Sequence, residues 1–171
     1  MQGGYVARIL DELDLRMMAE LQEDGRRSFR QISHDLDVAP GTVRMRVLQL
    51  IQDGVFRVIG VPDPWRMGYK FHATVGLKLK PGNAEKVADL LAEREEIGWV
   101  GLTSNTFDVM FEVALPDSRA FGEYREHFLA SLPGCVAVDV FEIWGIRKFH
   151  YRLVPPVTEW VRTHGIARES L

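Results

Sequence analysis

The chain of 171 residues has little of what marks secreted, membrane and disulfide-bonded proteins. Its single cysteine, Cys135, cannot form a disulfide within the chain. No apolar run approaches the roughly 18 residues of a membrane-spanning helix. The N-terminus also lacks the apolar core of a signal peptide. We therefore expect a cytoplasmic protein with no membrane partner.

Catalytic and metal-binding patterns are missing as well. The sequence has no phosphate-binding loop, no GxGxxG and no nucleophile elbow. Cys135 follows a Pro-Gly turn with no histidine nearby in sequence, which disfavours a catalytic thiol. The histidines show no metal-ligand spacing; they are His34, His72, His127, His150 and His164. The sequence thus predicts no catalytic residue, no metal, no cofactor and no enzyme.

The net charge of −3 gives no general sign of a nucleic-acid partner, but the positive charge is locally concentrated. Between Arg26 and Arg46 there are five arginines and two aspartates, a local charge of +3. A charge cluster of this size can also be an ordinary solvated face. Phosphate binding depends on the charges that reach the nucleic-acid backbone, and not on the total.

The run from Ser28 to Gly60 predicts two helices joined by a tight turn. Ser28 and Gln31 have the spacing of a capping box, and Pro40 is suited to the first turn of the second helix. Asp53 and Gly54 end that helix. Its apolar residues recur on one side; they are Val43, Val47, Leu50 and Ile51.

A first helix over 11–23, capped by Asp11, and a strand over 55–59 complete a winged-helix-like unit. A short buried helix that braces a helix with an exposed basic end is a helix-turn-helix, which fits the major groove of DNA. We predict DNA contacts at seven positions: Arg26, Arg27, Ser28, Arg30, Thr42, Arg44 and Arg46. Two alternatives stay open: Ser28 is only a helix cap, and Arg46 forms a structural ion pair with Asp53 or Asp24.

The second half of the chain changes to an alternating pattern. Apolar residues alternate with others over 71–79 and 107–115, and the predicted order is β-α-β-β-α-β, a ferredoxin-like arrangement. The fold class is therefore α+β. We expect a helix-turn-helix domain over 1–61, a stiff proline-containing linker over 62–70, a ferredoxin-like domain over 71–153 and a tail over 154–171.

The predicted sheet has helices on one face, yet neither set of alternating positions is convincingly polar. Met110 and Ala114 oppose Phe111 and Val113, for example. A sheet that is apolar on both faces favours dimerisation through the uncovered face. The alternative is that the tail, with Val157, Trp160 and Val161, covers it.

These motifs together resemble the Lrp/AsnC, or feast/famine, regulators. The resemblance extends from about Leu10 to Leu153 and includes LDELDLRMMAELQEDGRRSFRQIS, TVRMRVLQLIQDGVF and DPWRMGY. It implies a transcription regulator that binds double-stranded DNA. It also implies a small-molecule effector, typically an amino acid, and homodimers that join into tetramers, octamers or larger rings.

The family's effector pocket lies at the turn between the second and third strands, which usually reads Gly-Asp-(Tyr/Phe)-Asp. Here the turn reads Asn105-Thr106-Phe107-Asp108. Asparagine tolerates the left-handed geometry of a glycine, but Thr106 replaces an acid. The resemblance implies effector contacts at Ser104, Asn105, Thr106 and Asp108, and Asp108 has the alternative role of capping the hairpin.

Two other functions are compatible with the same design. Sirohaem decarboxylases share the two-domain arrangement, and His72 is the only well-placed candidate for the histidine that this chemistry needs. Alternatively, an interaction protein that has lost DNA binding would explain why Ala39 stands where the family usually has a capping serine.

Overall fold

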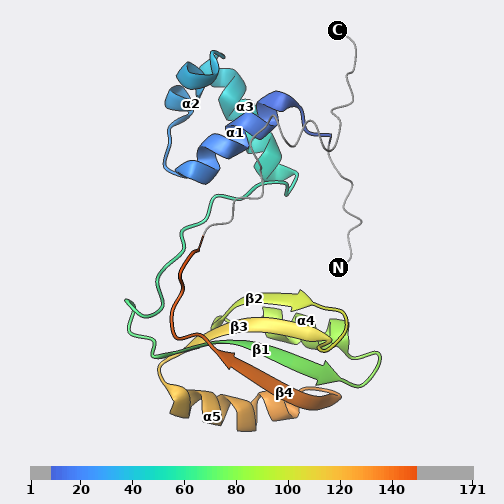
Figure 1. The fold of residues 1–171 in the computed structure, drawn as a ribbon. Coiled ribbons are helices and arrows are strands. Elements are labelled where there is room, and N and C mark those ends of the chain that lie inside the picture. The colour runs from blue at the N-terminus through green and yellow to red at the C-terminus, as the bar shows by residue number, and fades with distance from the viewer. Residues whose placement is uncertain (1–8, 150–171) are drawn as a thin grey trace. The chain divides into compact units, whose positions relative to one another are not determined.

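The computed structural model describes residues 9–149, and the chain divides into two compact units (Figure 1). Residues up to Gly60 belong to the first unit, and Val61–Lys148 form the second. The expected tail over 154–171 lies outside the described residues. The first unit is helical, and the second is a sheet with helices on one face.

The first unit contains helices α1 (Glu12–Glu23), α2 (Phe29–Leu36) and α3 (Pro40–Gln52). Capping boxes start the first two: Asp11 with Asp14 begins α1, and Ser28 with Gln31 begins α2. Ala39 precedes α3 and supplies no capping side chain, as the sequence predicts. The predicted buried faces are confirmed except at Ile51, which is exposed on the last turn of α3. One apolar cluster joins the three helices; its buried members are Met17, Leu21, Ile32, Leu36, Val43 and Val47.

The strand predicted over 55–59 is not formed, which corrects the winged part of the sequence prediction. Residues 56–63 have no regular secondary structure, and Val58 and Ile59 are exposed. A strand needs a neighbour to pair its backbone groups, and within residues 9–149 no strand lies beside this segment. The apolar residues of this segment favour a strand, but they cannot show whether a neighbouring strand is available to pair with it.

The segment predicted as a stiff linker is a folded turn on the second unit. The Asp63 carboxylate accepts hydrogen bonds from the backbone N–H groups of Trp65 and Arg66, at 3.0 and 3.2 Å. The backbone of Tyr69 donates to Pro64 at 3.0 Å. The Trp65 ring stands edge-on to His72, with 5.2 Å between the ring centres. These contacts fix the conformation of the chain just before it enters the first strand of the sheet.

The second unit is a four-stranded antiparallel sheet. Its strands are β1 (Phe71–Leu79), β2 (Ile97–Leu102), β3 (Val109–Leu115) and β4 (Cys135–Glu142), in the spatial order β2-β3-β1-β4. Helices α4 (Ala84–Ala92) and α5 (Ser118–His127) cover one face (Figure 1). The order βαββαβ with β1 in the centre confirms the predicted ferredoxin-like arrangement.

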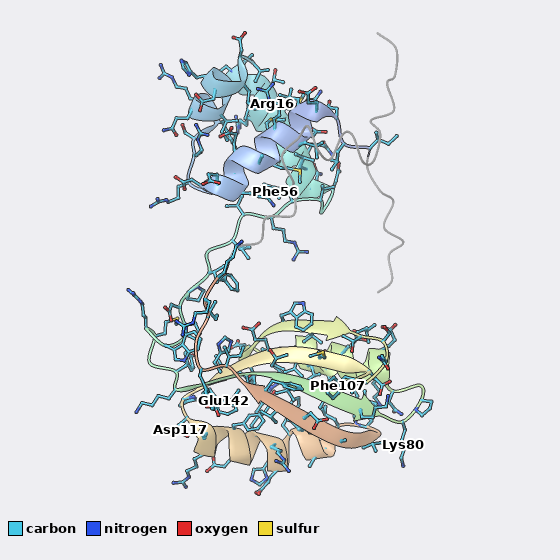
Figure 2. The ribbon with its side chains drawn as sticks, in the orientation of Figure 1. Arg16, Phe56, Lys80, Phe107, Asp117 and Glu142 are labelled. Atoms are coloured by element: carbon cyan, nitrogen blue, oxygen red, sulfur yellow. The ribbon has the colours of Figure 1, made fainter. Side chains whose placement is uncertain are left out.

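The two faces of the sheet differ as the alternation predicts. On the helix-covered face, β1 and β3 contribute a fully buried core that includes Val75, Leu77 and Phe111. The opposite face carries exposed Trp99 and Phe141. Glycines make room for rings there: a Cβ on Gly76 would lie 2.7 Å from the Phe107 ring, which lies against the sheet (Figure 2). This face therefore carries aromatic side chains that the helices do not cover.

Candidate nucleic-acid interface

Helix α3 buries one side and exposes the rest. Val43, Val47 and Leu50 lie in the core, while Arg44 is exposed and Thr42 is half-buried near the start of the helix. Among the described residues, the structure gives Arg44 no ion-pair partner. Its guanidinium is thus available to an external anion, as predicted for a DNA contact.

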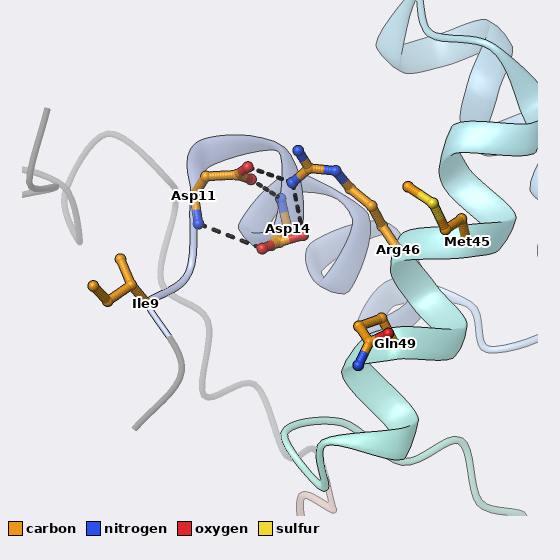
Figure 3. A pocket seen from close by; sticks show the side chains of 6 residues that line it. All are labelled: Ile9, Asp11, Asp14, Met45, Arg46 and Gln49. Carbon is orange, nitrogen blue, oxygen red and sulfur yellow. Dashed lines mark hydrogen bonds and ion pairs between the residues drawn. The ribbon is translucent and has the colours of Figure 1, made fainter. Parts of the chain in front are cut away.

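Arg46, also predicted to contact DNA, is bound to α1 instead. Its guanidinium pairs with the carboxylate of Asp11 and lies 3.1 Å from Oδ1 of Asp14 (Figure 3). Asp14 is only 2% exposed, so its charge depends on a partner inside the protein. The sequence left open an ion pair of Arg46 with Asp53 or Asp24. The structure shows that Arg46 pairs instead with Asp11 and Asp14, the two residues of the α1 capping box.

The electrostatics at Asp11 follow from this geometry. Partial burial raises the pKa of Asp11, but the hydrogen bonds from Arg46 and from the backbone of Asp14 outweigh burial and hold the pKa below its ordinary value of 3.8. The same pair raises the pKa of Arg46. An open pocket of about 340 Å³ lies beside the pair; it is lined by Ile9, Asp11, Asp14, Met45, Arg46 and Gln49 (Figure 3).

The arginines before α2 also differ in their availability. Arg27 pairs with Glu20 on α1 and with Asp35 on α2, so it connects two helices. Arg26 is highly exposed, and within the described part of the chain its ion-pair partner is its neighbour Asp24, at 3.3 Å. Arg30 is exposed and has no ion-pair partner among residues 9–149. Arg26 and Arg30 are therefore the predicted contacts of this group that are free to reach a phosphate.

Ser28 acts as the cap of α2. Its Oγ accepts from the backbone N–H of Gln31 at 3.2 Å, and its own N–H donates to the Gln31 side chain at 2.8 Å. A pocket of about 460 Å³ lies around this cap; it is lined by Arg27, Ser28, Arg30, Gln31, His34 and Asp35. The exposed hydroxyl also donates to Oε1 of Gln31 at 2.8 Å, so a phosphate contact at Ser28 requires the hydroxyl to leave that acceptor.

The predicted effector turn joins β2 to β3. Asn105 has a φ of 86°, the left-handed backbone geometry that the sequence predicts for an asparagine in this turn. The hydroxyl of Thr103 donates to the Phe107 carbonyl at 2.8 Å and closes the turn. Ser104, Asn105 and Thr106 are exposed at its tip. The turn is thus rigid at its base and open to solvent at its tip.

The Asp108 carboxylate binds β1, and not the β2–β3 hairpin that the alternative to ligand binding had it cap. Its carboxylate accepts from the backbone N–H of Leu79 at 2.7 Å and lies 3.4 Å from Nζ of Lys78. The Leu79 hydrogen bond, helped by Lys78, lowers the pKa of Asp108. Much of the acceptor capacity of this carboxylate is therefore used within the sheet.

The histidine required by the decarboxylase alternative is enclosed. His72 is 4% exposed, and its Nε2 lies 2.5 Å from Oε1 of Glu112. Residues 9–149 contain no cluster of three or more side chains suited to a metal ion. In the same range, no helix combines the length and the apolar character that crossing a bilayer requires.

Comparison with known proteins adds sequence relatives to this geometry. Residues 10–51 match the AsnC-type helix-turn-helix domain. An HTH-type transcriptional regulator from Pyrococcus furiosus is 31% identical over 147 residues, which cover 85% of this chain and 99% of that protein. The likeness therefore extends over both units of the chain.

Solved structures share the fold at lower identity. AsnC of E. coli superposes with a TM-score of 0.74 at 16% identity and covers 86% of this chain and 100% of its own. A regulator from Neisseria meningitidis, solved in complex with L-Met, gives a TM-score of 0.74 at 18% identity, over 88% of this chain and 98% of its own. These matches confirm the arrangement of a helix-turn-helix followed by a ferredoxin-like sheet.

Removing Arg46 should destabilise the helical unit. Arg46→Met removes the guanidinium that lies 3.1 Å from the buried Asp14 carboxylate, and we expect a loss of about 2 kcal/mol in the free energy of unfolding. Arg44→Met is the matched control and should change stability by less than about 0.5 kcal/mol. Hydrogen exchange of the α1 and α3 amides reports this unit separately from the sheet. Equal protection in both variants would contradict the structural role of Arg46.

The Asp11–Arg46 pair should make stability depend on pH. Because the folded pKa of Asp11 is lowered, its contribution is present above the ordinary pKa of 3.8 and is lost as pH falls through the folded value. Asp11→Asn keeps a capping side chain but removes the charge. Its unfolding free energy, measured by urea denaturation between about pH 5 and pH 2, should fall less steeply than that of the wild type. Parallel curves would show that the pair contributes nothing.

Proposed function

The chain belongs to the Lrp/AsnC family of transcriptional regulators, and we propose that it binds operator DNA with α3 and responds to a small effector bound by the second unit. The observation that carries the DNA-binding part is the exposed guanidinium of Arg44 on a helix whose opposite side is packed against α1 and α2. Such a helix is rigidly held and presents its outer side to a groove.

The predicted DNA contacts divide into two classes. Arg44 and Thr42 lie on the first turns of α3, where side chains reach base edges in helix-turn-helix proteins. Arg26, Arg30 and Ser28 lie outside α3 and suit phosphates, which position the protein without reading sequence. We assign Arg27 and Arg46 to positioning these helices, since both are held by carboxylates of the protein.

A dimer through the open face of the sheet completes the proposal. Exposed Trp99 lies on β2 and exposed Phe141 on β4, at opposite edges of this face, and these two rings are the anchors that we propose for the partner surface. A symmetric dimer would present two α3 helices to a pseudo-palindromic site, one DNA turn apart. We propose further assembly of dimers into tetramers or octamers. For the domains we propose a helix-turn-helix over 1–61, a ferredoxin-like domain over 71–153 whose entry is the folded segment 62–70, and a tail over 154–171.

The proposed effector site is the tip of the turn between β2 and β3. Ser104, Asn105 and Thr106 are exposed there, and the turn's base is fixed by Asp108 and Thr103. A small polar molecule, an amino acid in the first instance, fits exposed hydroxyl and amide groups. The Neisseria meningitidis neighbour, solved with L-Met, supports this ligand class by analogy of fold. The site acts on DNA binding only if the effector prefers one assembly over another.

No observation favours an enzyme. The enclosed His72 is unsuited to proton transfer with a bound tetrapyrrole, and relatives of the chain are named as regulators. We therefore propose a non-enzymatic, cytoplasmic regulator. The lack of a capping side chain at Ala39 is compatible with DNA binding, because α3 forms and packs without it.

DNA affinity should depend steeply on salt. The logarithm of the binding constant should fall linearly with the logarithm of salt concentration, with a slope of about −0.9 for each phosphate contacted. Arg30→Ala should reduce that slope by about one unit and weaken all sequences alike, whereas Arg44→Ala should reduce the preference for the operator over random DNA. Fluorescence anisotropy with the chain's own upstream DNA measures both. Binding that is absent, or indifferent to salt, would refute the DNA-binding proposal.

An effector should change the assembly through the turn at residues 104–106. Titrating the twenty amino acids against sedimentation mass, we expect one or a few to shift the population of dimers and larger assemblies. Thr106→Tyr should abolish that shift, because the bulky ring blocks an exposed tip without disturbing the core. An unchanged melting temperature serves as the control. If the shift persists in Thr106→Tyr, the effector binds elsewhere.

A further inference from the structure

Helix α3 carries an apolar strip on the side that faces away from its core. Gly41, Met45 and Leu48 follow one another at i, i+4 and i+7, which places them in one line along the helix. Met45 is 63% exposed and Leu48 is 48% exposed. An exposed apolar line at the centre of the outer face is unexpected on a helix that has water as its only neighbour.

The packing of the protein itself does not explain why position 41 is a glycine. It lies in the first turn of α3, and a Cβ added there would meet no atom within 4 Å. Glycine in a helix is less stable than alanine, since the unfolded chain has more freedom to lose. The internal packing therefore does not require glycine here, whereas close approach by another molecule at this turn would.

The polar side chains near the strip are mostly occupied. The Gln49 amide donates to the Asp53 carboxylate at 2.7 Å, and Arg46 is held by Asp11 and Asp14. Arg44, beside Met45, is exposed and has no ion-pair partner among the described residues. Few groups of α3 are therefore left to read bases by hydrogen bonds alone.

We propose that Gly41, Met45 and Leu48 form a methyl-reading surface that selects thymine in the major groove. Thymine alone presents a C5-methyl group there, and apolar side chains recognise it by contact. The absence of a side chain at Gly41 lets the first turn of α3 approach the base edges. Arg44 binds a neighbouring guanine or phosphate. This proposal deepens the DNA-binding function proposed above and rests on it.

Charge complementarity identifies DNA as the occupant of the strip. The strip lies directly beside the exposed guanidinium of Arg44, which has no ion-pair partner among the described residues. Phosphates flank the major groove on both sides, so an apolar strip with a cation at its side matches methyl groups between phosphates. A protein partner is the competing occupant, and the experiment below separates the two.

The test replaces thymine by uracil, which removes only the methyl group. Duplexes selected from a random pool by the full-length wild type would be remade with dU at one dT position at a time. At each contacted position the wild type should lose about fourfold in affinity, which corresponds to about 0.8 kcal/mol for one buried methyl group. Met45→Ala should bind the dT and dU duplexes equally at the positions that Met45 contacts.

Gly41→Ala separates a DNA effect from a folding effect. We expect this variant to have a higher melting temperature, since alanine favours the helix, and yet to bind the selected duplex severalfold more weakly. Gly122→Ala is the matched control: Gly122 lies in α5, and a Cβ there also meets nothing within 4 Å. It should raise the melting temperature and leave DNA binding unchanged.

The outcomes distinguish this proposal from the one on which it rests. If the wild type binds the selected duplex in a salt-dependent manner but no dU position matters, the methyl-reading surface is refuted and DNA binding stands. If Met45→Ala keeps DNA affinity and its dU response but changes the oligomeric mass, the strip is a protein contact. If the wild type binds no duplex at all, the DNA-binding function itself fails.

Discussion

Helix α3 is held against α1 by the guanidinium of one residue, Arg46, which pairs with two carboxylates. Asp14 is buried in α1, and its charge is compensated by Arg46 of α3 at 3.1 Å. Asp11 shares the same guanidinium and caps α1, so a single arginine connects the start of one helix to the middle of another. A buried carboxylate without a cation is costly, which makes this arrangement of α1 and α3 strongly favoured over others. Apolar packing alone would specify the angle between the helices less sharply.

The arginines of the helical unit thereby divide between fold and function. Arg27 and Arg46 hold helices together, and their positive charge is compensated within the protein. Arg30 and Arg44 have no such compensation among the described residues and remain available for DNA. A count of positive charge in the sequence therefore overstates the charge that DNA can meet. The geometry of the carboxylates decides which cations are free.

The sequence predicted the local structure well and the long-range contacts poorly. The N-cap at Asp11, the capping box at Ser28 and the alternation in β1 are short-range patterns, and the structure confirms them. The partner of Arg46 could not be found this way, because Asp11 lies 35 residues away while Asp53 is nearer in sequence.

Two further differences have the same cause. The run over 55–59 is rich in residues that favour strands but lacks a neighbouring strand among the described residues, and a pattern within one segment cannot reveal that. Asp108 matches a turn motif in the sequence. Its carboxylate accepts a hydrogen bond from the backbone N–H of Leu79, which lies on another strand, and the motif alone could not predict that contact. The sequence thus identified the candidate site, but not the division of its residues between binding and support.

This division bears on how a protein with a net charge of −3 can regulate transcription. One helical unit with few unpaired arginines gains little binding free energy from contacts with phosphates, so a single copy should bind DNA weakly. In the proposed dimer, two copies joined through the sheets would bind a two-part site far better, because the second contact becomes intramolecular. Affinity would then depend on the assembly, and an effector that shifts the assembly would shift DNA occupancy without touching α3. Under this proposal, modest charge on each unit is what lets assembly control binding.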